Sequence, residues 1–149
     1  MPGTSSDLPI VVLHVEDDEA LRRSVAMLLR AVGCISKAVA SGEEALAWIN
    51  QRRHDPDVLI VDFQLPGDLD GSDVAQEIFR VLGRPIPTIM LSGHLTEVTP
   101  PWMPGAPLLC LWKPVHADIL TKAVEVFATF GRFVRGRSRR SGEQPAFTR

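Results

Sequence analysis

The chain has 149 residues, of which 45% are hydrophobic and 23% charged, a composition typical of one compact domain with a single core. This hydrophobic content excludes a wholly disordered chain, two cysteines are too few for a disulfide scaffold, and no apolar run reaches the roughly 20 residues of a membrane-spanning helix. The net charge of −2 conceals an asymmetry, because residues 1–130 carry 10 Lys/Arg against 17 Asp/Glu, a balance of −7, and residues 131–149 carry six Arg against one Glu, a balance of +5.

Five short apolar runs alternate with longer stretches of helical periodicity along the acidic part of the chain. Such runs, rich in Val, Ile and Leu, are typical of strands that are buried on both faces of a parallel sheet. The predicted strands are Ile10–Val15, Cys34–Val39, Val58–Phe63, Thr88–Ser92 and Leu108–Trp112. We therefore expect an α/β fold with a doubly wound, five-stranded parallel sheet.

At least four helices are predicted between and after these strands. Asp18 is the predicted N-cap of the first helix, and Ser41 begins the second with the spacing of a capping box, since Glu44 follows three residues later. The third follows Gly71. The last runs from about His116 to Phe130, and its period predicts four inward side chains: Ile119, Ala123, Val124 and Phe127.

The stretch between the fourth and fifth strands breaks this alternation. It contains Pro100, Pro101, Pro104 and Pro107, and each proline lacks a backbone N–H and fixes φ. A full helix cannot form there. We expect a loop with at most one helical turn near Thr96, so that the fourth helix of the alternating pattern is short or absent.

The two ends of the chain differ from its body. Residues 1–7 are expected to form an N-terminal extension, residues 8–130 the folded domain, and residues 131–149 a basic tail, largely disordered beyond about Val134 because it has no sustained apolar period. A solvated terminus is a simpler interpretation of the tail than a contact with nucleic acid or a membrane surface. The N-terminus has no basic stretch followed by an apolar segment, so we expect a cytoplasmic location.

Polar side chains stand at the predicted carboxyl ends of four strands. Glu16 and Asp17 follow the first strand, Asp62 lies at the end of the third, Ser92 ends the fourth and Lys113 follows the fifth. Ligands of open parallel sheets bind in the crevice at this edge, so we expect these residues to form one site. The predicted third strand is otherwise buried, and a carboxylate at its end needs a partner.

The carboxylates at this edge favour a magnesium site. Oxygen ligands without nearby Cys or His pairs suit Mg²⁺ better than Zn²⁺. Glu16, Asp17 and Asp62 together carry −3, which Lys113 only partly offsets, so a phosphate dianion is repelled unless a divalent ion is bound. With that ion, Asp62 can act as a nucleophile toward phosphorus while Ser92 and Lys113 contact phosphoryl oxygens. The expected product is an aspartyl phosphate.

The polar residues at the strand ends come in a fixed order along the alternating chain: Glu16-Asp17, Asp62 followed by LPGDLDG, Ser92-Gly93 and Lys113-Pro114. This set closely resembles the receiver domain of two-component response regulators. The resemblance covers roughly residues 8–130. It implies a flavodoxin-like sheet with strand order 2-1-3-4-5, Asp62 as phosphoacceptor and a cis bond between Lys113 and Pro114. It also implies that Asp17 binds Mg²⁺ directly, Glu16 through water, and the Gln64 carbonyl directly.

Four further positions bear on how long the phosphorylated state lasts and on how the signal is passed on. Gln64 and His94, each two residues past a site residue, are expected to lie over the phosphoryl group and to affect its lifetime. The segment from Asp62 to Gly71 is one residue longer than the commonest receiver form and gains Gly67, which should sharpen the turn. Cys110 stands where receivers commonly carry the aromatic residue that moves on activation.

The altered region around the proline-rich loop also contains Trp102 and Trp112. The two side chains could form an exposed patch for a protein partner or pack the loop onto the sheet, and the sequence favours neither. Because the usual switch residue and the fourth helix are both changed, we expect the signal to leave by a surface other than the common one.

We therefore expect a stand-alone receiver, not an independent enzyme, that takes a phosphoryl group from a phosphohistidine on a sensor histidine kinase or phosphotransfer protein. It would signal by protein contact, without a DNA-binding output domain, and a homodimer is possible. Three alternatives stay open. They are a receiver-fold adaptor that is never phosphorylated, a receiver module of a hybrid histidine kinase, and a magnesium-dependent phosphatase, which the absence of a second acid at Gln64 disfavours.

Overall fold

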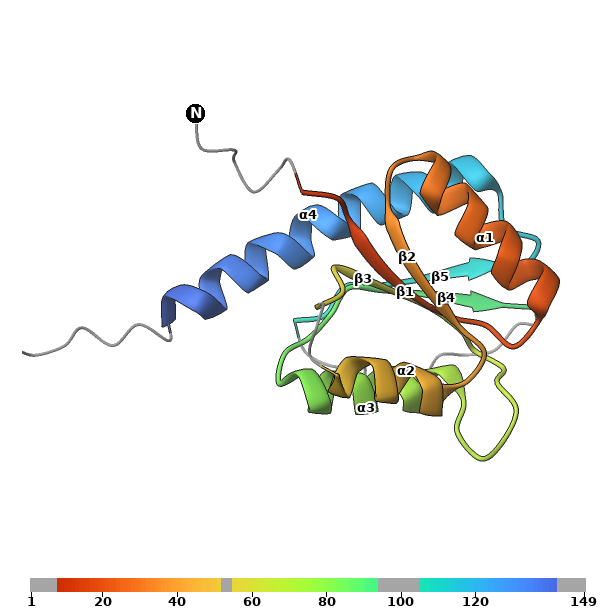
Figure 1. Cartoon of the computed structure of the whole chain (residues 1–149), viewed down its shortest axis with the longest axis horizontal. Coiled ribbons are helices and arrows are strands. Elements are labelled where there is room, and N and C mark those ends of the chain that lie inside the picture. The colour runs from red at the N-terminus through yellow and green to blue at the C-terminus, as the bar shows by residue number, and fades with distance from the viewer. Residues whose placement is uncertain (1–7, 52–54, 94–104, 142–149) are drawn as a thin grey trace, which may run out of the picture.

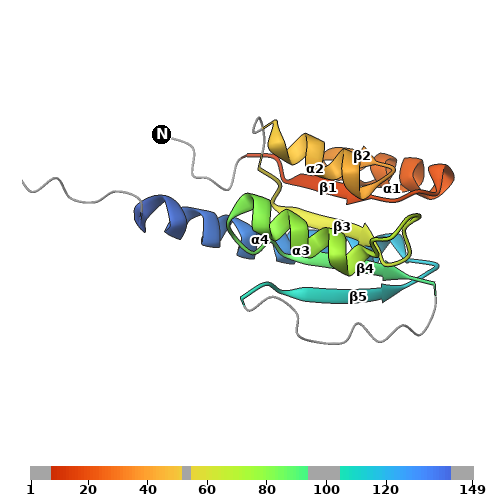
Figure 2. The same cartoon turned by 90° about the horizontal axis from the view of Figure 1, so that it is seen from below.

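The computed structural model describes residues 8–51, 55–93 and 105–141. Its centre is a five-stranded parallel sheet with strand order β2-β1-β3-β4-β5, seen toward one of its faces in Figure 2. The strands are β1 (Val11–Val15), β2 (Ile35–Val39), β3 (Val58–Asp62), β4 (Thr88–Ser92) and β5 (Leu108–Trp112). The predicted fold class, strand order and strand positions are confirmed, with bounds that shift by at most one residue.

The helices form two layers, one on each face of the sheet (Figure 1). They are α1 (Glu19–Ala31), α2 (Gly42–Asn50), α3 (Gly71–Leu82) and α4 (Ala117–Ser141). α1 and α4 cover one face, and α2 and α3 cover the other. None of the helices within the described ranges is long and apolar enough to cross a membrane.

Short side chains fix where the first three helices begin. Asp18, as predicted, caps α1 by accepting a hydrogen bond from the backbone N–H of Leu21, and Ser41 caps α2 by accepting one from Glu44. A reciprocal capping box forms at α3, where Asp70 and Asp73 each accept a hydrogen bond from the other's backbone. These caps satisfy backbone N–H groups that the first turn of a helix leaves without partners.

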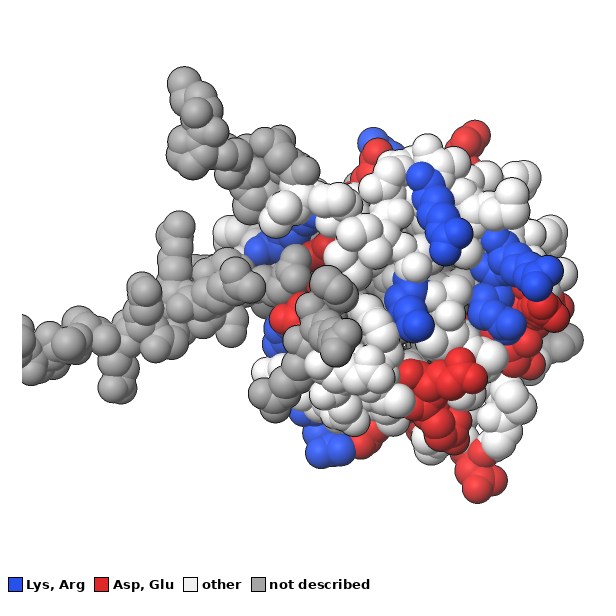
Figure 3. All heavy atoms as spheres, viewed as in Figure 1, with Lys and Arg blue, Asp and Glu red and all other residues white. Residues whose placement is uncertain are grey.

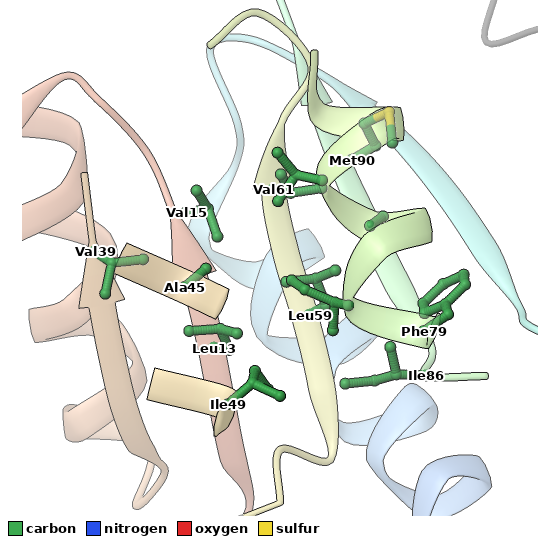
Figure 4. Packing of buried hydrophobic residues seen from close by; sticks show 13 residues of the cluster. Leu13, Val15, Val39, Ala45, Ile49, Leu59, Val61, Phe79, Ile86 and Met90 are labelled. Atoms are coloured by element: carbon green, nitrogen blue, oxygen red, sulfur yellow. The ribbon is translucent and has the colours of Figure 1, made fainter. Parts of the chain in front are cut away.

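The core lies on both faces of β3, whose residues are all buried. Leu59 and Val61 point toward α2 and α3, where they pack with side chains such as Ile49 and Phe79 (Figure 4). Val58 and Ile60 point the other way and belong to the cluster under α1 and α4. Because successive side chains of a strand face opposite sides, a central strand of this kind must be apolar throughout.

The last helix differs from its prediction at one inward position and in length. Val124 is buried and Ala123 and Phe127 pack against the core, as predicted, but Ile119 is 51% exposed, and Leu120 and Ala128 are buried in addition. The helix also continues to Ser141 instead of ending near Phe130. Adding a residue to an existing helix costs far less than nucleating one, and arginine is a good helix former, so the Arg-rich segment extends α4.

Between β4 and β5, no helix occurs in the residues that the structure describes, which agrees with the expectation from the prolines. The turn expected near Thr96 lies outside the described residues, as do His94 and Trp102. On the α2/α3 face, the described helices leave β5 uncovered (Figure 2).

Candidate functional site

The carboxyl ends of three strands bring acidic and basic side chains together. Glu16 and Asp17 follow β1, Asp62 is the last residue of β3, and Lys113 follows β5. The backbone sets these positions, because Glu16 N–H donates to the carbonyl of Val39 at 3.0 Å and anchors the end of β1 to β2. All parallel strands point the same way, so side chains distant in sequence meet at one edge.

Three carboxylates at this edge form a compact group. Each of Glu16, Asp17 and Asp62 offers one oxygen, and these oxygens lie within 4.8 Å of one another. Glu16 is fully buried, Asp62 is 5% exposed, and Asp17 is exposed. Glu16 Oε2 is buried without a hydrogen bond. An all-oxygen donor set that includes a buried carboxylate oxygen without a hydrogen bond fits a hard divalent cation such as Mg²⁺ better than a soft metal.

Lys113 is the positive charge of the site. Its Nζ donates to Asp62 Oδ2 at 3.0 Å and lies 3.3 Å from Glu16 Oε2. Burial by itself disfavours the ammonium, but the hydrogen bond to Asp62 and the charge of Glu16 outweigh it and raise the pKa of Lys113. One cation therefore contacts two carboxylates, and the site keeps a negative excess.

Burial and charge together weaken the acidity of Glu16. Desolvation first, and the neighbouring charge of Asp62 second, raise the pKa of Glu16 to about 7, against the opposing effect of Lys113. The backbone N–H of Asp18 donates to Glu16 Oε1 at 3.2 Å. The backbone N–H of Gln64 similarly donates to Asp62 Oδ1 at 3.2 Å, which fixes the orientation of that carboxylate.

The sequence profile of the family described as "Response regulator receiver domain" matches residues 12–125. The chain belongs to this family. Receiver domains are modules of two-component signalling and are in general not catalytic enzymes.

Relatives and solved structures agree with this assignment. Nodulation protein W of Bradyrhizobium diazoefficiens is 36% identical over 145 residues, which are 95% of this chain and 59% of that protein. Transcriptional regulatory protein AfsQ1 of Streptomyces coelicolor is 32% identical over 87 residues, which are 58% of this chain and 36% of that protein. The chain thus spans less than two thirds of the length of these relatives.

Two solved receivers show the same fold. A response regulator receiver protein from Sinorhizobium medicae superimposes with a TM-score of 0.70 at 23% identity and covers 81% of this chain and 95% of its own. The receiver domain of the hybrid histidine kinase CckA has a TM-score of 0.66 at 31% identity, with 79% and 98% covered.

Three further predicted site features, at Ser92, at the Lys113–Pro114 bond and at Gln64, lie in the part of the chain that the structure describes. Ser92 ends β4, and its carbonyl accepts a hydrogen bond from the backbone N–H of Lys113 at 2.8 Å. The bond between Lys113 and Pro114 is cis, the isomer that the resemblance implies. Gln64 is exposed, and His94 lies outside the described residues. The binding and lifetime roles of these residues stay predictions.

His14, which the sequence places inside the first strand, is fully buried there. Neither ring nitrogen has a hydrogen-bond partner. Burial, and then the charges of Arg22 and Lys113, lower the pKa of His14 to about 4. The imidazole is therefore neutral at physiological pH and belongs to the core below the site.

Sequence reasoning missed Gly71 as part of the site. A Cβ at this position would lie 2.2 Å from the carbonyl oxygen of Asp62, and the Gly71 N–H donates to the carbonyl of Phe63 at 2.7 Å. Only a residue without a side chain lets α3 begin against the backbone of Asp62. The signal available in the sequence was a glycine at the start of a helix that follows the Asp62 loop. Gly67, within that loop, has a φ of 97° and makes the turn as predicted.

Arg22 is a second residue that sequence reasoning missed. Its Nη1 donates to the carbonyl of Glu16 at 2.9 Å and to that of Asp17 at 3.3 Å. These hydrogen bonds connect α1 to the loop that carries two of the acids. An arginine in the first turns of a helix is ordinary on an exposed face, so only the structure reveals this contact.

Proposed function

We propose that this receiver accepts a phosphoryl group on Asp62 from a phosphohistidine of a sensor histidine kinase or phosphotransfer protein. Mg²⁺ would be held by Glu16, Asp17 and Asp62, with the Gln64 carbonyl as a further ligand. The observation that carries the proposal is the hydrogen bond of Lys113 to a buried carboxylate that also belongs to the three-acid group. The proposed nucleophile, the cation and the proposed metal ligands therefore lie at one edge of the sheet.

The proposed transfer is a displacement at phosphorus. A carboxylate oxygen of Asp62 forms a bond to phosphorus as the P–N bond breaks, and the electron pair of that bond stays on the imidazole nitrogen of the donor. Glu16, Asp17 and Asp62 bring −3 and Lys113 brings +1, so a bound divalent ion would make the site neutral before the dianion enters. Lys113 and Ser92 then contact phosphoryl oxygens, the first as a cation and the second as a hydroxyl donor.

The proposal covers the acceptor chemistry and a signal passed on by protein contact. It holds both for a free-standing regulator and for a receiver within a longer protein such as a hybrid kinase. Gln64 and His94 are proposed to set the lifetime of the phosphoaspartate because of their positions in the sequence.

A receiver-fold adaptor that is never phosphorylated is the second candidate. Cys110, at the position of the usual switch aromatic, is exposed on β5, which favours an altered output but does not remove any acceptor residue.

The test uses the whole 149-residue chain and a small P–N donor, phosphoramidate, in the presence of Mg²⁺. Intact mass spectrometry should show a gain of about 80 Da, the mass of one phosphoryl group, and the gain should require Mg²⁺. Asp62→Asn should abolish it. The matched control is Asp68→Asn, an exposed acid of the same loop, which should be phosphorylated like the wild type. A chain that gains no mass, or an Asp62→Asn variant that still does, would rule out the proposed acceptor and favour the adaptor.

A further inference from the structure

Arg22 binds three successive carbonyl groups in the turn between β1 and α1. Its backbone N–H donates to the carbonyl of Asp18 at 2.9 Å, which is the first hydrogen bond of α1. Its guanidinium Nη1 donates to the carbonyls of Glu16 at 2.9 Å and of Asp17 at 3.3 Å. These two carbonyls precede the N-cap and take no part in the hydrogen bonds of the helix. The side chain of Arg22 therefore fixes the backbone that carries two of the three acids of the site.

Asp17 is the acid whose position depends most on this backbone. The other two are held through their own carboxylates, since Glu16 Oε1 accepts from the N–H of Asp18 at 3.2 Å and Asp62 Oδ2 accepts from Lys113 at 3.0 Å. The carboxylate of Asp17 is exposed and accepts no hydrogen bond from any residue that the structure describes. One of its oxygens nevertheless lies within 4.8 Å of the other two acids. The turn itself therefore places Asp17.

We propose that Arg22 is a positioning residue for the divalent cation that the proposed phosphoryl transfer requires. The inference rests on that proposed function and adds a residue that touches neither the cation nor the phosphoryl group. By binding the two carbonyls, the guanidinium keeps Asp17 close to Asp62, so the turn does not have to become ordered when the cation binds. Groups that orient the ligands of a metal commonly change its affinity tenfold or more.

The charge of Arg22 and its hydrogen bonds act on a bound cation in opposite directions. Like charges repel, so the charge alone would weaken cation binding. The hydrogen bonds strengthen binding by ordering the turn. Removal of the side chain therefore tightens binding if the charge dominates and weakens it if positioning dominates. We expect weakening, because Arg22 is only partly buried and solvent and salt screen its charge, whereas the two hydrogen bonds persist.

Arg23, the next residue along α1, offers a matched control. It carries the same charge at the same end of the helix, but its side chain is 77% exposed and pairs with Glu19 at 2.9 Å instead of with the turn. Figure 3 shows Lys and Arg side chains beside Asp and Glu side chains at the right of the view, the end of the molecule where α1 begins in Figure 1. The loss of one positive charge at this end can therefore be separated from the loss of the two carbonyl contacts.

The cation affinity of the unphosphorylated 149-residue chain tests the proposal without any phosphoryl donor. Mn²⁺ is the probe, because carboxylate sites bind it as they bind Mg²⁺, and electron paramagnetic resonance measures the free ion. Arg22→Met should raise the Mn²⁺ dissociation constant about tenfold, whereas Arg23→Met should leave it unchanged. Arg22→Lys keeps the charge, but its side chain is one bond shorter and lacks the planar guanidinium, so its dissociation constant should lie between those of the wild type and Arg22→Met.

Controls distinguish a failure of this inference from a failure of the proposed function. Circular dichroism should show every variant folded at the titration temperature, since neither Arg22 nor Arg23 is buried. If Arg22→Met binds Mn²⁺ as tightly as the wild type or more tightly, or if Arg23→Met loses as much affinity, the positioning role is overturned and the proposed function stands. If the wild-type chain binds no Mn²⁺, or if Asp17→Asn binds it like the wild type, the proposed cation site is wrong and both proposals fail.

Discussion

β3 and β5 each place one charged residue at the same edge of the sheet, yet they do so from opposite kinds of surroundings. β3 is buried over its whole length and ends in Asp62. β5 is an edge strand on which Cys110 and Trp112 are exposed, and Trp112 reaches 55%. The strand pairing places Lys113 independently of these side chains, because its N–H donates to the carbonyl of Ser92 at 2.8 Å.

The difference in burial between β3 and β5 means that the residues of the proposed phosphorylation chemistry and the outward residues of β5 can change independently. An interior strand tolerates few substitutions because both of its faces pack, and it holds Asp62 in one position. An edge strand can change its outward side chains as long as its backbone pairing persists. A cysteine at position 110, where receivers commonly carry the switch aromatic, is therefore compatible with the proposed phosphoryl acceptance at Asp62.

Substitutions in β3 and β5 should differ most in how far they lower the free energy of unfolding. Ile60 on β3 is fully buried, so Ile60→Ala leaves a cavity and should lower the free energy of unfolding by about 3 kcal/mol. Trp112→Ala on β5 removes a larger side chain but should cost less than Ile60→Ala, because more than half of Trp112 already faces solvent and its removal leaves no closed cavity. Urea denaturation of both variants measures the two values.

The two variants also test what covers the outward face of β5. If Trp112→Ala lowers stability as much as Ile60→Ala does, that face is packed and the contrast between the strands fails. Phosphoryl uptake on Asp62 should persist in Trp112→Ala, since the side chain of Trp112 has no place in the proposed chemistry.

The second effect concerns the close contact that positions Asp62. Gly71→Ala puts a Cβ 2.2 Å from the Asp62 carbonyl oxygen, a backbone atom that the sheet holds in place. We expect a loss of about 2 kcal/mol in stability, as is typical of overpacked sites, together with slower phosphoryl uptake. Gly93→Ala is the matched control, because a Cβ there meets nothing within 4 Å. Equal stability of the two variants would show that the start of α3 shifts freely and does not fix Asp62.

Much of the site could be predicted from the sequence because each element of it is local. Glu16, Asp62 and Lys113 stand at the ends of apolar runs, and parallel strands align their carboxyl ends whatever the intervening chain does. Gly71 and Arg22 could not be found in this way. Their roles depend on the distance between a helix and a backbone carbonyl, which no periodicity encodes.

The predicted inward position of Ile119 in α4 was wrong for a related reason, although Val124 is buried and Ala123 and Phe127 pack on the core as predicted. The segment contains two apolar stripes, one with Leu120 and Val124 and the other with Ile119 and Val126, and both repeat with the helical period. Only packing on the sheet decides which stripe is buried. The length of α4 was also missed, because composition describes the tail as an isolated segment and ignores the helix that it continues.

The smallest effect is a difference in thiol reactivity. Cys110 is exposed on β5, whereas Cys34, just before β2, is 8% exposed, and both thiols are free. Iodoacetamide should therefore label Cys110 first and reach Cys34 only on unfolding. Mass spectrometry of digested protein assigns the label, and Cys110→Ser should leave the native chain unlabelled.

The pH dependence of iodoacetamide labelling is a further test of the difference between Cys110 and Cys34. Partial burial raises the pKa of the exposed Cys110 thiol, and burial followed by the charge of Glu125 raises the pKa of Cys34. Only the thiolate reacts, so a raised pKa lowers the reactive fraction at neutral pH, and the Cys110 rate should keep rising above about pH 8.5, where an ordinary thiol is half ionised. A rate that levels off at lower pH would mean that a positive charge approaches Cys110. Equal protection of both cysteines would mean that the outward face of β5 is as closed as the core, and the proposed separation between a rigid acceptor strand and an adaptable edge strand would then fail.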